Sequence, residues 1–191
     1  TESGVLTFLP ENLFKLKFIP TDLVMDASGR YLYAVNPTIN SLAVFVVDPD
    51  SGTLTLPKSQ YPNTGTKPVA IALDPAGRFS FVANAKGNTV SVFTHRRILS
   101  PAMYPINREG SAFSTGNNPV ALAVDPTGKF LVVANIDSND LSVFSIHFHE
   151  GKLEAFIESP FASGKASVSV AMHSSGKFVY VINADSGDIS S

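Results

Sequence analysis

The sequence predicts an all-β fold made of repeated four-stranded units, and three observations support this prediction. The 191-residue chain repeats one short pattern at intervals of roughly 50 residues, a period typical of stacked sheet units. Its apolar runs are short, rich in Val, Ile, Phe and Tyr, and bounded by Gly, Pro, Asn and Asp, as strands joined by tight turns are. No long run has the apolar spacing of an amphipathic helix without a Gly or Pro in it. The four copies begin at Asp26 (DASGRYLYAVN), Asp74 (DPAGRFSFVAN), Asp125 (DPTGKFLVVAN) and His173 (HSSGKFVYVIN).

Each unit contains three apolar runs that we predict to be its first three strands. The second strand is the apolar half of the repeated pattern itself. The first strands are TDLVMD from Thr21, VAIALD from Val69, VALAVD from Val120 and SVSVAM from Ser167. The third strands are SLAVFVV from Ser41, TVSVFTH from Thr89, LSVFSIH from Leu141 and a shortened DISS at the C-terminus. Because runs such as FLVVAN and LAVFVV are apolar almost throughout, we expect both faces of these sheets to be covered.

A fourth strand and the turn residues complete the unit. SGTLTLP from Ser51 and EGKLEAF from Glu150 each start with a glycine turn and continue as a short strand. The Asp-Pro-x-Gly sequences at Asp74 and Asp125 suit type I or II turns between the first and second strands, because Pro fixes φ at the second turn position. Asn-rich tips such as NAKGN and NIDSN are expected to join the second and third strands.

These residues resemble a known family of repeats. GRFSFVAN with NTVSVF, and GKFLVVAN with NDLSVF, resemble the YVTN-type repeat, and the layout over roughly residues 4–191 is similar to lactonase-like β-propellers related to 6-phosphogluconolactonase. The resemblance implies a β-propeller of four-stranded antiparallel blades, about four blades per chain, in a single domain covering 1–191. The expected units are 22–68, 69–119, 120–167 and 168–191, the last completed by a strand at 4–10, because SGVLTFLP at Ser3 matches SGTLTLP at Ser51.

Three assemblies of these units stay open at the level of sequence. The chain can close a four-bladed ring, form an eight-bladed ring from two chains, or be part of the family's usual seven-bladed ring. A free-standing open stack is the least expected of the arrangements, because terminal repeats of such an array need polar outer faces. Here the strands YLYAV and LAVFVV of the first full unit are as apolar as those of the third.

Composition excludes several classes of function. The net charge of −2, from 14 basic and 16 acidic residues, argues against a general nucleic-acid binder. The basic cluster of His95, Arg96 and Arg97 is interpreted as a solvated loop. With no Cys there is no disulfide, zinc thiolate or thiol nucleophile. No apolar run reaches the roughly 18 residues needed for a membrane span. Because YVTN-like propellers are often exported, the resemblance favours an extracytoplasmic location.

The sequence assigns no catalytic residue. A lactonase needs a group that polarises the lactone carbonyl and a base that activates water. The resemblance implies a His near the start of the innermost strand, yet KPVAIA, NPVALA and ASVSVA contain none. His147 and His149 share one face of a predicted strand and are interpreted as outer-strand residues, and His173 as a turn residue. We expect neither a metal site nor a cofactor.

The turns between second and third strands should share one end of a propeller with the loops that lead into the innermost strands. Polar side chains there form the candidate ligand site, since concave mouths with convergent polar groups are the usual binding sites. The repeated asparagines are interpreted as turn stabilisers or as a ligand-facing ring. The candidate ligand-binding residues are Asn36, Lys67, Asn84, Lys86, Asn118, Asn135, Asp137 and Lys165.

Three functions are compatible with this site. The first is a binding or interaction module that takes a small polar ligand or a protein partner at the channel mouth. The second is a lactone hydrolase resembling 6-phosphogluconolactonase. The third is an inactive half-propeller that assembles as a homodimer through its blade edges.

Overall fold

The computed structural model describes residues 14–57, 61–96 and 104–191, which form sixteen strands and no helix. This confirms the all-β prediction. The strands make four antiparallel sheets, called A to D here in chain order. Sheet A contains β1 (Leu23–Met25), β2 (Tyr31–Asn36), β3 (Ser41–Val47) and β4 (Leu54–Thr55). Sheet B contains β5 (Pro68–Leu73), β6 (Phe79–Asn84), β7 (Thr89–Arg96) and β8 (Tyr104–Ser114).

The two C-terminal sheets vary this plan. Sheet C contains β9 (Pro119–Val124), β10 (Phe130–Asn135), β11 (Asp140–Ile146), β12 (Leu153–Ala155) and a fifth short strand, β13 (Phe161–Ala162), which also pairs with β11. Sheet D contains β14 (Ser167–Met172), β15 (Val179–Asn183) and β16 (Asp188–Ser190). The predicted fourth strand of the last unit, at 4–10, lies outside the described residues.

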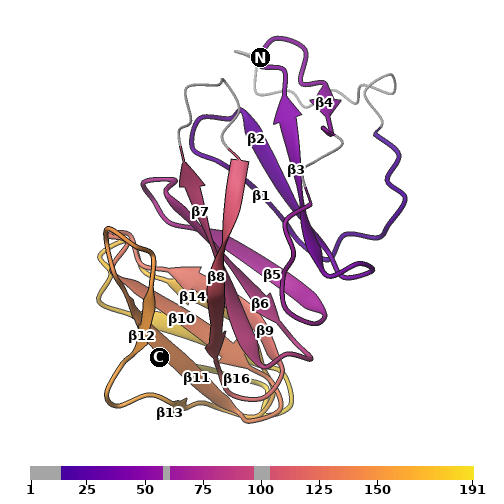
Figure 1. The fold of residues 1–191 in the computed structure, drawn as a ribbon. Coiled ribbons are helices and arrows are strands. Elements are labelled where there is room, and N and C mark those ends of the chain that lie inside the picture. Colours follow the sequence, from indigo (N-terminus) through magenta and orange to yellow (C-terminus); the bar gives the residue numbers. More distant parts are fainter. Residues whose placement is uncertain (1–13, 58–60, 97–103) are drawn as a thin grey trace, which may run out of the picture.

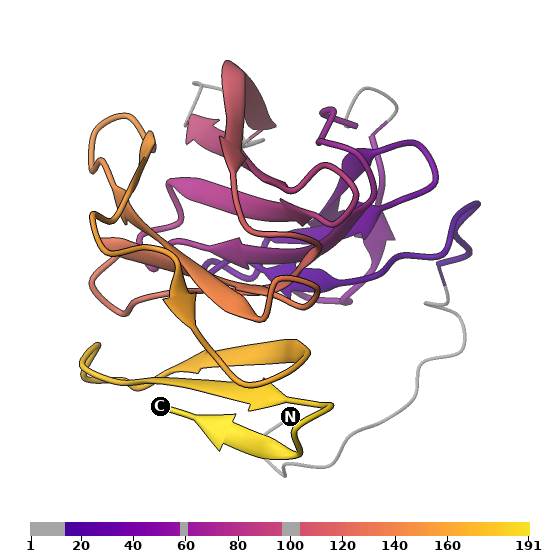
Figure 2. The same ribbon diagram turned by 90° about the horizontal axis from the view of Figure 1, so that it is seen from below.

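The four sheets lie face to face along an arc (Figure 1). Strands β1 and β2 contact β5, β5 and β6 contact β9, and β9 and β10 contact β14, so each sheet packs on the next one in sequence. The view from below shows the same succession (Figure 2). The outward face of sheet D is exposed and does not pack on sheet A. The described residues therefore form a partial propeller, an open arc of blades.

The core consists of two layers between sheets. Between A and B, the buried side chains of Tyr33, Val35 and Val44 pack against Val82 and Phe93. The layer between B and C is equally apolar and contains Phe79, Phe81, Val90, Val92, Leu131, Val133, Phe144, Ile146 and Leu153. Burying such side chains contributes about 1.5–3 kcal/mol each, so the contacts between blades are a main source of stability.

The free face of sheet A is covered by the chain's own N-terminal segment. Leu16 and Phe18 pack against Ala34, Ala43 and Phe45 there. The ring of Phe14 meets that of Phe45 edge to face, with centroids 5.3 Å apart. One end of the arc is therefore covered, whereas the other end, at sheet D, is exposed.

Asp-x-x-Gly turns join the first two strands of sheets A, B and C, and the His-x-x-Gly turn at His173 does so in sheet D. Asp125 accepts hydrogen bonds from the backbone N–H groups of Lys129 (2.6 Å) and Phe130 (2.7 Å), and Asp26 and Asp74 accept the equivalent ones. The glycine that follows has φ of +65° to +70° in all four copies, a conformation that favours Gly. The turn prediction made from the sequence is thus correct.

Candidate functional site

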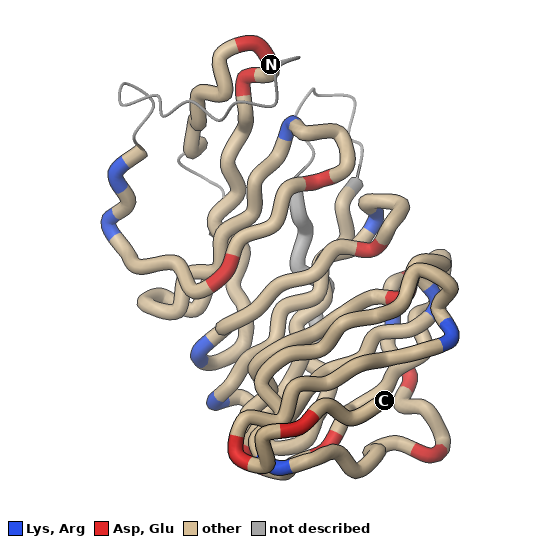
Figure 3. Tube along the Cα trace, turned by 180° about the vertical axis from the view of Figure 1, so that it is seen from behind, with Lys and Arg blue, Asp and Glu red and all other residues tan. Residues whose placement is uncertain are grey.

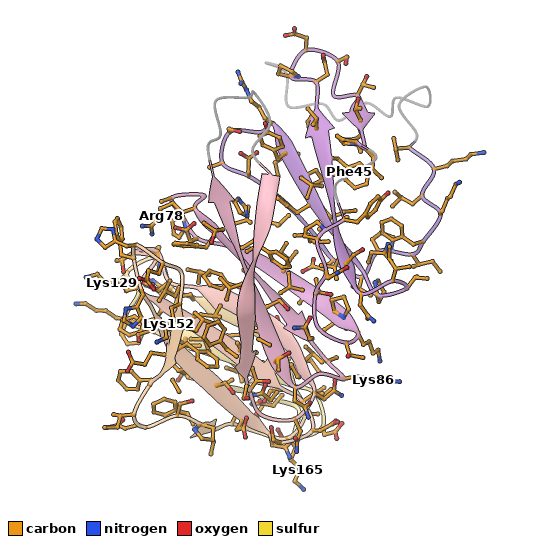
Figure 4. All side chains as sticks on the ribbon, in the orientation of Figure 1. Phe45, Arg78, Lys86, Lys129, Lys152 and Lys165 are labelled. Atoms are coloured by element: carbon orange, nitrogen blue, oxygen red, sulfur yellow. The ribbon has the colours of Figure 1, made fainter. Side chains whose placement is uncertain are left out.

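The candidate site lies at one end of the arc, called here the loop end. At this end each turn between a second and a third strand lies beside the loop that leads into an inner strand. Backbone hydrogen bonds join the two, from Ala85 N to Lys67 O (2.8 Å) and from Ile136 N to Asn118 O (3.1 Å). Lys86 and Lys165 are labelled at this end in Figure 4, whereas Arg78, Lys129 and Lys152 lie toward the opposite end.

Asparagines at the turn tips link each blade to the next. Asn40 Oδ1 accepts a hydrogen bond from the backbone N–H of Lys67, Asn88 Oδ1 from that of Asn118, and Asn139 Oδ1 from that of Ala166, at 2.7–2.9 Å. All three asparagines have φ near +50° to +55°, which Asn tolerates better than most residues. The same link therefore recurs at all three junctions between sheets.

The repeated asparagines that end the second strands are buried. Asn84 Nδ2 donates to Thr89 Oγ1 (3.1 Å) and Ser91 Oγ (2.9 Å). Asn135 and Asn183 make the equivalent pair of bonds to Asp140 and Ser142 and to Asp188 and Ser190. Asn36 differs, because its Oδ1 accepts from the backbone N–H of Thr38 (3.0 Å). Internal hydrogen bonds thus engage all four of these side chains.

Two of these buried amides keep an oxygen without a hydrogen-bond partner among the described residues. They are Asn84 Oδ1 and Asn135 Oδ1. In sheet D the hydroxyl of Ser167 donates to Asn183 Oδ1 at 3.1 Å. The residues that pair with Asn84 and Asn135 across the sheet are Pro68 and Pro119, which have no side-chain donor.

The exposed candidates are charged. Lys67, Lys86, Asp137 and Lys165 are exposed, and Asn118 is half-buried. Figure 3 shows basic and acidic segments interspersed along this end of the arc. Of the eight residues expected from sequence, the asparagines at 36, 84 and 135 are buried. The side chains with access to solvent are those of the three lysines, Asp137 and, in part, Asn118. Ammonium groups bind phosphate and carboxylate oxygens.

Sequence reasoning missed a buried polar cluster between sheets A and B. His95 lies on β7 and is buried, so its interpretation as part of a solvated loop is wrong. Its Nε2 lies 3.0 Å from Ser80 Oγ, and its Nδ1 lies 3.2 Å from the hydroxyl of Tyr33, whose ring stacks on the imidazole. The signal that could have found it is its position two residues after the apolar Phe93, which places both side chains on the same face of one strand.

Burial controls the protonation of this cluster. It lowers the pKa of His95 from 6.5 to about 4, and the nearby carboxylates of Asp74 and Asp26 only partly oppose the shift. Burial, with Asp26, also raises the pKa of Tyr33. Although His95 and Ser80 resemble a base and a nucleophile, Ser80 is wholly buried, so no substrate can reach it.

The histidines of the hairpin between β11 and β12 are exposed. His147 Nε2 lies 3.0 Å from Glu154 Oε2. No group of three or more His, Cys, Asp or Glu side chains that could hold a metal occurs within the described ranges. The described part of the chain also has no helix with the length and apolarity that a bilayer crossing requires.

The fold and the loop end define a segment of a β-propeller. The chain belongs to the lactonase family of seven-bladed β-propellers, whose sequence model matches residues 1–98 and 105–170. The resemblance noted from the GRFSFVAN and GKFLVVAN repeats is thereby confirmed.

Two curated relatives named 6-phosphogluconolactonase show the extent of the similarity. The chain is 32% identical over 97 residues to a 6-phosphogluconolactonase of Formosa agariphila, covering 48% of the chain and 27% of that protein. It is 27% identical over 146 residues to a 6-phosphogluconolactonase of Pectobacterium carotovorum, covering 71% of the chain and 41% of that protein. The chain thus spans less than half the length of these relatives.

Solved structures agree on the fold. A structure described as a 6-phosphogluconolactonase from Bacteroides uniformis superposes with a TM-score of 0.76 at 16% identity, covering 89% of this chain and 49% of that one. A periplasmic gluconolactonase from Pseudomonas aeruginosa superposes with a TM-score of 0.72 at 21% identity, covering 90% and 52%. At these identities the likeness establishes the propeller architecture alone.

Proposed function

We propose that this protein is a sugar-lactone hydrolase of the 6-phosphogluconolactonase type, with its site at the loop end. The match of the lactonase family over most of the chain carries this proposal. The named relatives support hydrolysis better than they support a general binding or interaction module, the first of the three functions compatible with the sequence. The chain covers only part of each relative, and the exposed lysines at the loop end favour a phosphorylated lactone as the substrate.

Opening a lactone ring adds water to an ester carbonyl and breaks the ring C–O bond. Negative charge grows on the carbonyl oxygen in the transition state, and fixed cations stabilise it. In this proposal the exposed ammonium groups of Lys67, Lys86 and Lys165 bind the phosphate of the substrate and stabilise that oxygen. The carboxylate of Asp137 accepts a proton from the attacking water and then donates it to the ring oxygen as the C–O bond breaks, which leaves the open-chain hydroxy acid.

Hydrolysis of 6-phosphoglucono-δ-lactone, compared with the unphosphorylated lactone, tests the proposal. We expect turnover above the spontaneous rate. Lys67→Ala and Lys165→Ala should lower kcat/KM for the phosphorylated substrate by roughly 10-fold, the value of about 1.4 kcal/mol of lost charge pairing. Asp137→Asn should lower kcat for both lactones, because it removes the proposed base.

Lysines at the opposite end of the arc provide matched controls. Lys129→Ala and Lys152→Ala remove the same charge from sites far from the loop end and should leave both rates unchanged (Figure 4). Hydrolysis no faster than in buffer would overturn the proposed function. Equal losses in the control variants would overturn the assignment of the site to the loop end.

A further inference from the structure

The loop that enters sheet B is fixed between two turns of the loop end. The backbone N–H of Lys67 in this loop donates to Asn40 Oδ1, in the turn of sheet A, at 2.9 Å. The N–H groups of Ala85 and Gly87, in the turn of sheet B, donate to carbonyl oxygens of the same loop at 2.8 and 3.1 Å. Lys86 lies between these two donors. The exposed side chains of Lys67 and Lys86 therefore belong to adjacent segments whose backbones are bonded to each other.

The loop that enters sheet D is fixed in the same way, but its surroundings carry different charges. Ala166 N–H donates to Asn139 Oδ1, in the turn of sheet C, at 2.7 Å. Asp185 N–H, in the turn of sheet D, donates to Lys165 O at 3.1 Å. The turn of sheet C carries Asp137, and both aspartates are exposed. Lys165 therefore lies between two turns that each present a carboxylate.

The charges at the loop end are thus arranged unequally along the arc. No acidic residue occurs in the four loop-end segments from sheet A to the start of sheet C, which are 36–40, 64–67, 84–88 and 115–118. Asp22, just before β1, is half-buried on the sheet A side. Both of its carboxylate oxygens already accept backbone N–H bonds, from Leu23 at 2.8 Å and from Ile71 at 2.9 Å. Lys67 and Lys86 are therefore neighbouring cations in a region without an exposed loop-end carboxylate.

This arrangement suits a phosphate group at the sheet B side of the loop end. Two ammonium groups on adjacent segments repel each other, and an anion that both of them contact reverses the sign of that interaction. A phosphate monoester carries between about 1.5 and 2 negative charges at neutral pH and has three oxygens that accept hydrogen bonds. It can therefore bind two ammonium groups at once. Beside Lys165, the carboxylates of Asp137 and Asp185 repel the same group.

We propose that Lys67 and Lys86 determine specificity for a phosphorylated lactone by binding its phosphate together, whereas Lys165 stabilises the lactone carbonyl oxygen near Asp137. The substrate then lies along the loop end, with its phosphate toward sheet B and its ring toward sheets C and D. Lys86 and Lys165 occupy separate positions at this end, as such an orientation requires (Figure 4). This inference rests on the proposed hydrolysis and adds to it a division of roles among the three lysines.

The ratio of the kcat/KM values for 6-phosphoglucono-δ-lactone and for the unphosphorylated lactone tests this division. Lys67→Gln and Lys86→Gln should each lower the ratio by roughly 10-fold, because each removes one of the two charges that hold the phosphate. Lys165→Gln should lower both kcat/KM values to a similar extent and leave their ratio within about twofold. Lys86→Arg keeps the charge and should restore the ratio to within about threefold of the unsubstituted protein.

Binding of inorganic phosphate, measured by calorimetry at low ionic strength, tests the lysine pair without hydrolysis. The double variant Lys67→Gln/Lys86→Gln should bind phosphate on the order of 50-fold more weakly. Lys165→Gln should change the affinity by less than about twofold, and so should Lys129→Gln, which removes an exposed lysine at the opposite end of the arc. Equal weakening in all these variants, or no binding to the unsubstituted protein, would overturn the assignment of the pair.

The proposed function and this inference fail in different ways. If neither lactone is hydrolysed faster than in buffer, the proposed function is wrong, and phosphate binding alone decides the role of the pair. If both lactones are hydrolysed but Lys165→Gln lowers the ratio as much as Lys86→Gln does, the division of roles is wrong and hydrolysis stands. Lys67 has φ of +55°, so if Lys67→Gln does not fold, Lys86→Gln decides.

Discussion

At the scale of single residues, repetition in the sequence indicated which polar groups matter, but not what each one does. Asn84, Asn135 and Asn183 could be singled out because they recur. Their structural reading, as stabilisers of a turn, agrees with the hydrogen bonds that their amides make inside the blade. The partners could not be predicted, because the serines that accept these bonds are seven residues away on another strand, where only the register brings them together.

His95 shows the limit of reasoning from neighbours in sequence. The two arginines that follow it in the sequence suggest a solvated loop. In the structure His95 lies on β7, and its side chain is buried between sheets A and B. Local composition cannot reveal this, because strand alternation sends adjacent residues to opposite faces. The two hydroxyls beside its ring nitrogens come from other strands, Ser80 from the neighbouring strand β6 and Tyr33 from β2, 62 residues away in the sequence.

The neutral state of His95 predicts a pH dependence of stability. Its folded pKa of about 4 lies below the unfolded value of 6.5, so the unfolded chain takes up a proton first as pH falls. The contribution to the free energy of unfolding is therefore complete above pH 6.5 and decreases by about 3 kcal/mol as pH falls to 4. Urea unfolding between pH 7 and pH 4 measures it.

His95→Gln is the control, because glutamine keeps polar groups at this position and does not titrate. The acid-induced loss of stability should be smaller in His95→Gln by about that same 3 kcal/mol. Carboxylates elsewhere titrate equally in both proteins and cancel in the comparison. Parallel pH profiles for the two proteins would contradict a buried, neutral imidazole.

At the scale of elements, the junction between blades depends on glycines that the sequence marks only weakly. Gly65, Gly116 and Gly164 each lie directly against the amide of the buried asparagine in their own junction. Their φ values are not in the left-handed region, so it is close approach, and not backbone conformation, that excludes a side chain. Strand positions were predictable from apolar runs. This contact was not, because it brings a loop glycine against an asparagine that ends a strand about 19 residues further along the chain.

Gly116→Ala tests the importance of that contact. An added Cβ would lie 2.7 Å from Asn135 Nδ2 and also collide with Asp140 and Ser138. Overpacking of this kind lowers the free energy of unfolding by about 1–3 kcal/mol. The adjacent exposed residue gives a matched control, since Asn117→Ala should change stability by less than about 0.5 kcal/mol. Urea midpoints of the two variants provide the measurement, and equal midpoints would refute the close contact.

At the scale of the whole molecule, the repeat period was sufficient to predict a stack of four-stranded sheets. It could not predict that the described sheets form an open arc, because the same apolar strands are compatible with four, seven or eight blades. The packing of the N-terminal segment on sheet A could not be predicted either, because Leu16 and Phe18 belong to no repeated strand. Closure depends on the angle between neighbouring blades, and no local pattern encodes that angle.

The unequal number of neighbours predicts a gradient of local stability along the arc. Sheet B packs against sheets on both faces, whereas sheet D packs only on sheet C among the described residues. Repeat arrays are stabilised mainly by such nearest-neighbour interfaces. Amides of β6 should therefore exchange hydrogen on the order of 100-fold more slowly than those of β15. Native-state exchange read by mass spectrometry tests this, and equal protection in β6 and β15 would argue against the gradient.

The segment over sheet A gives the arc a direction. With Leu16 and Phe18 in place, sheet A has no free outer surface on which another sheet could pack, whereas sheets B, C and D each pack on the sheet that precedes them in the sequence. A ribosome releases these blades in the same order. We therefore expect these sheets to fold during synthesis in order from A to D. At each stage, the sheet synthesised last has its outer apolar face exposed to solvent until the next sheet packs on it.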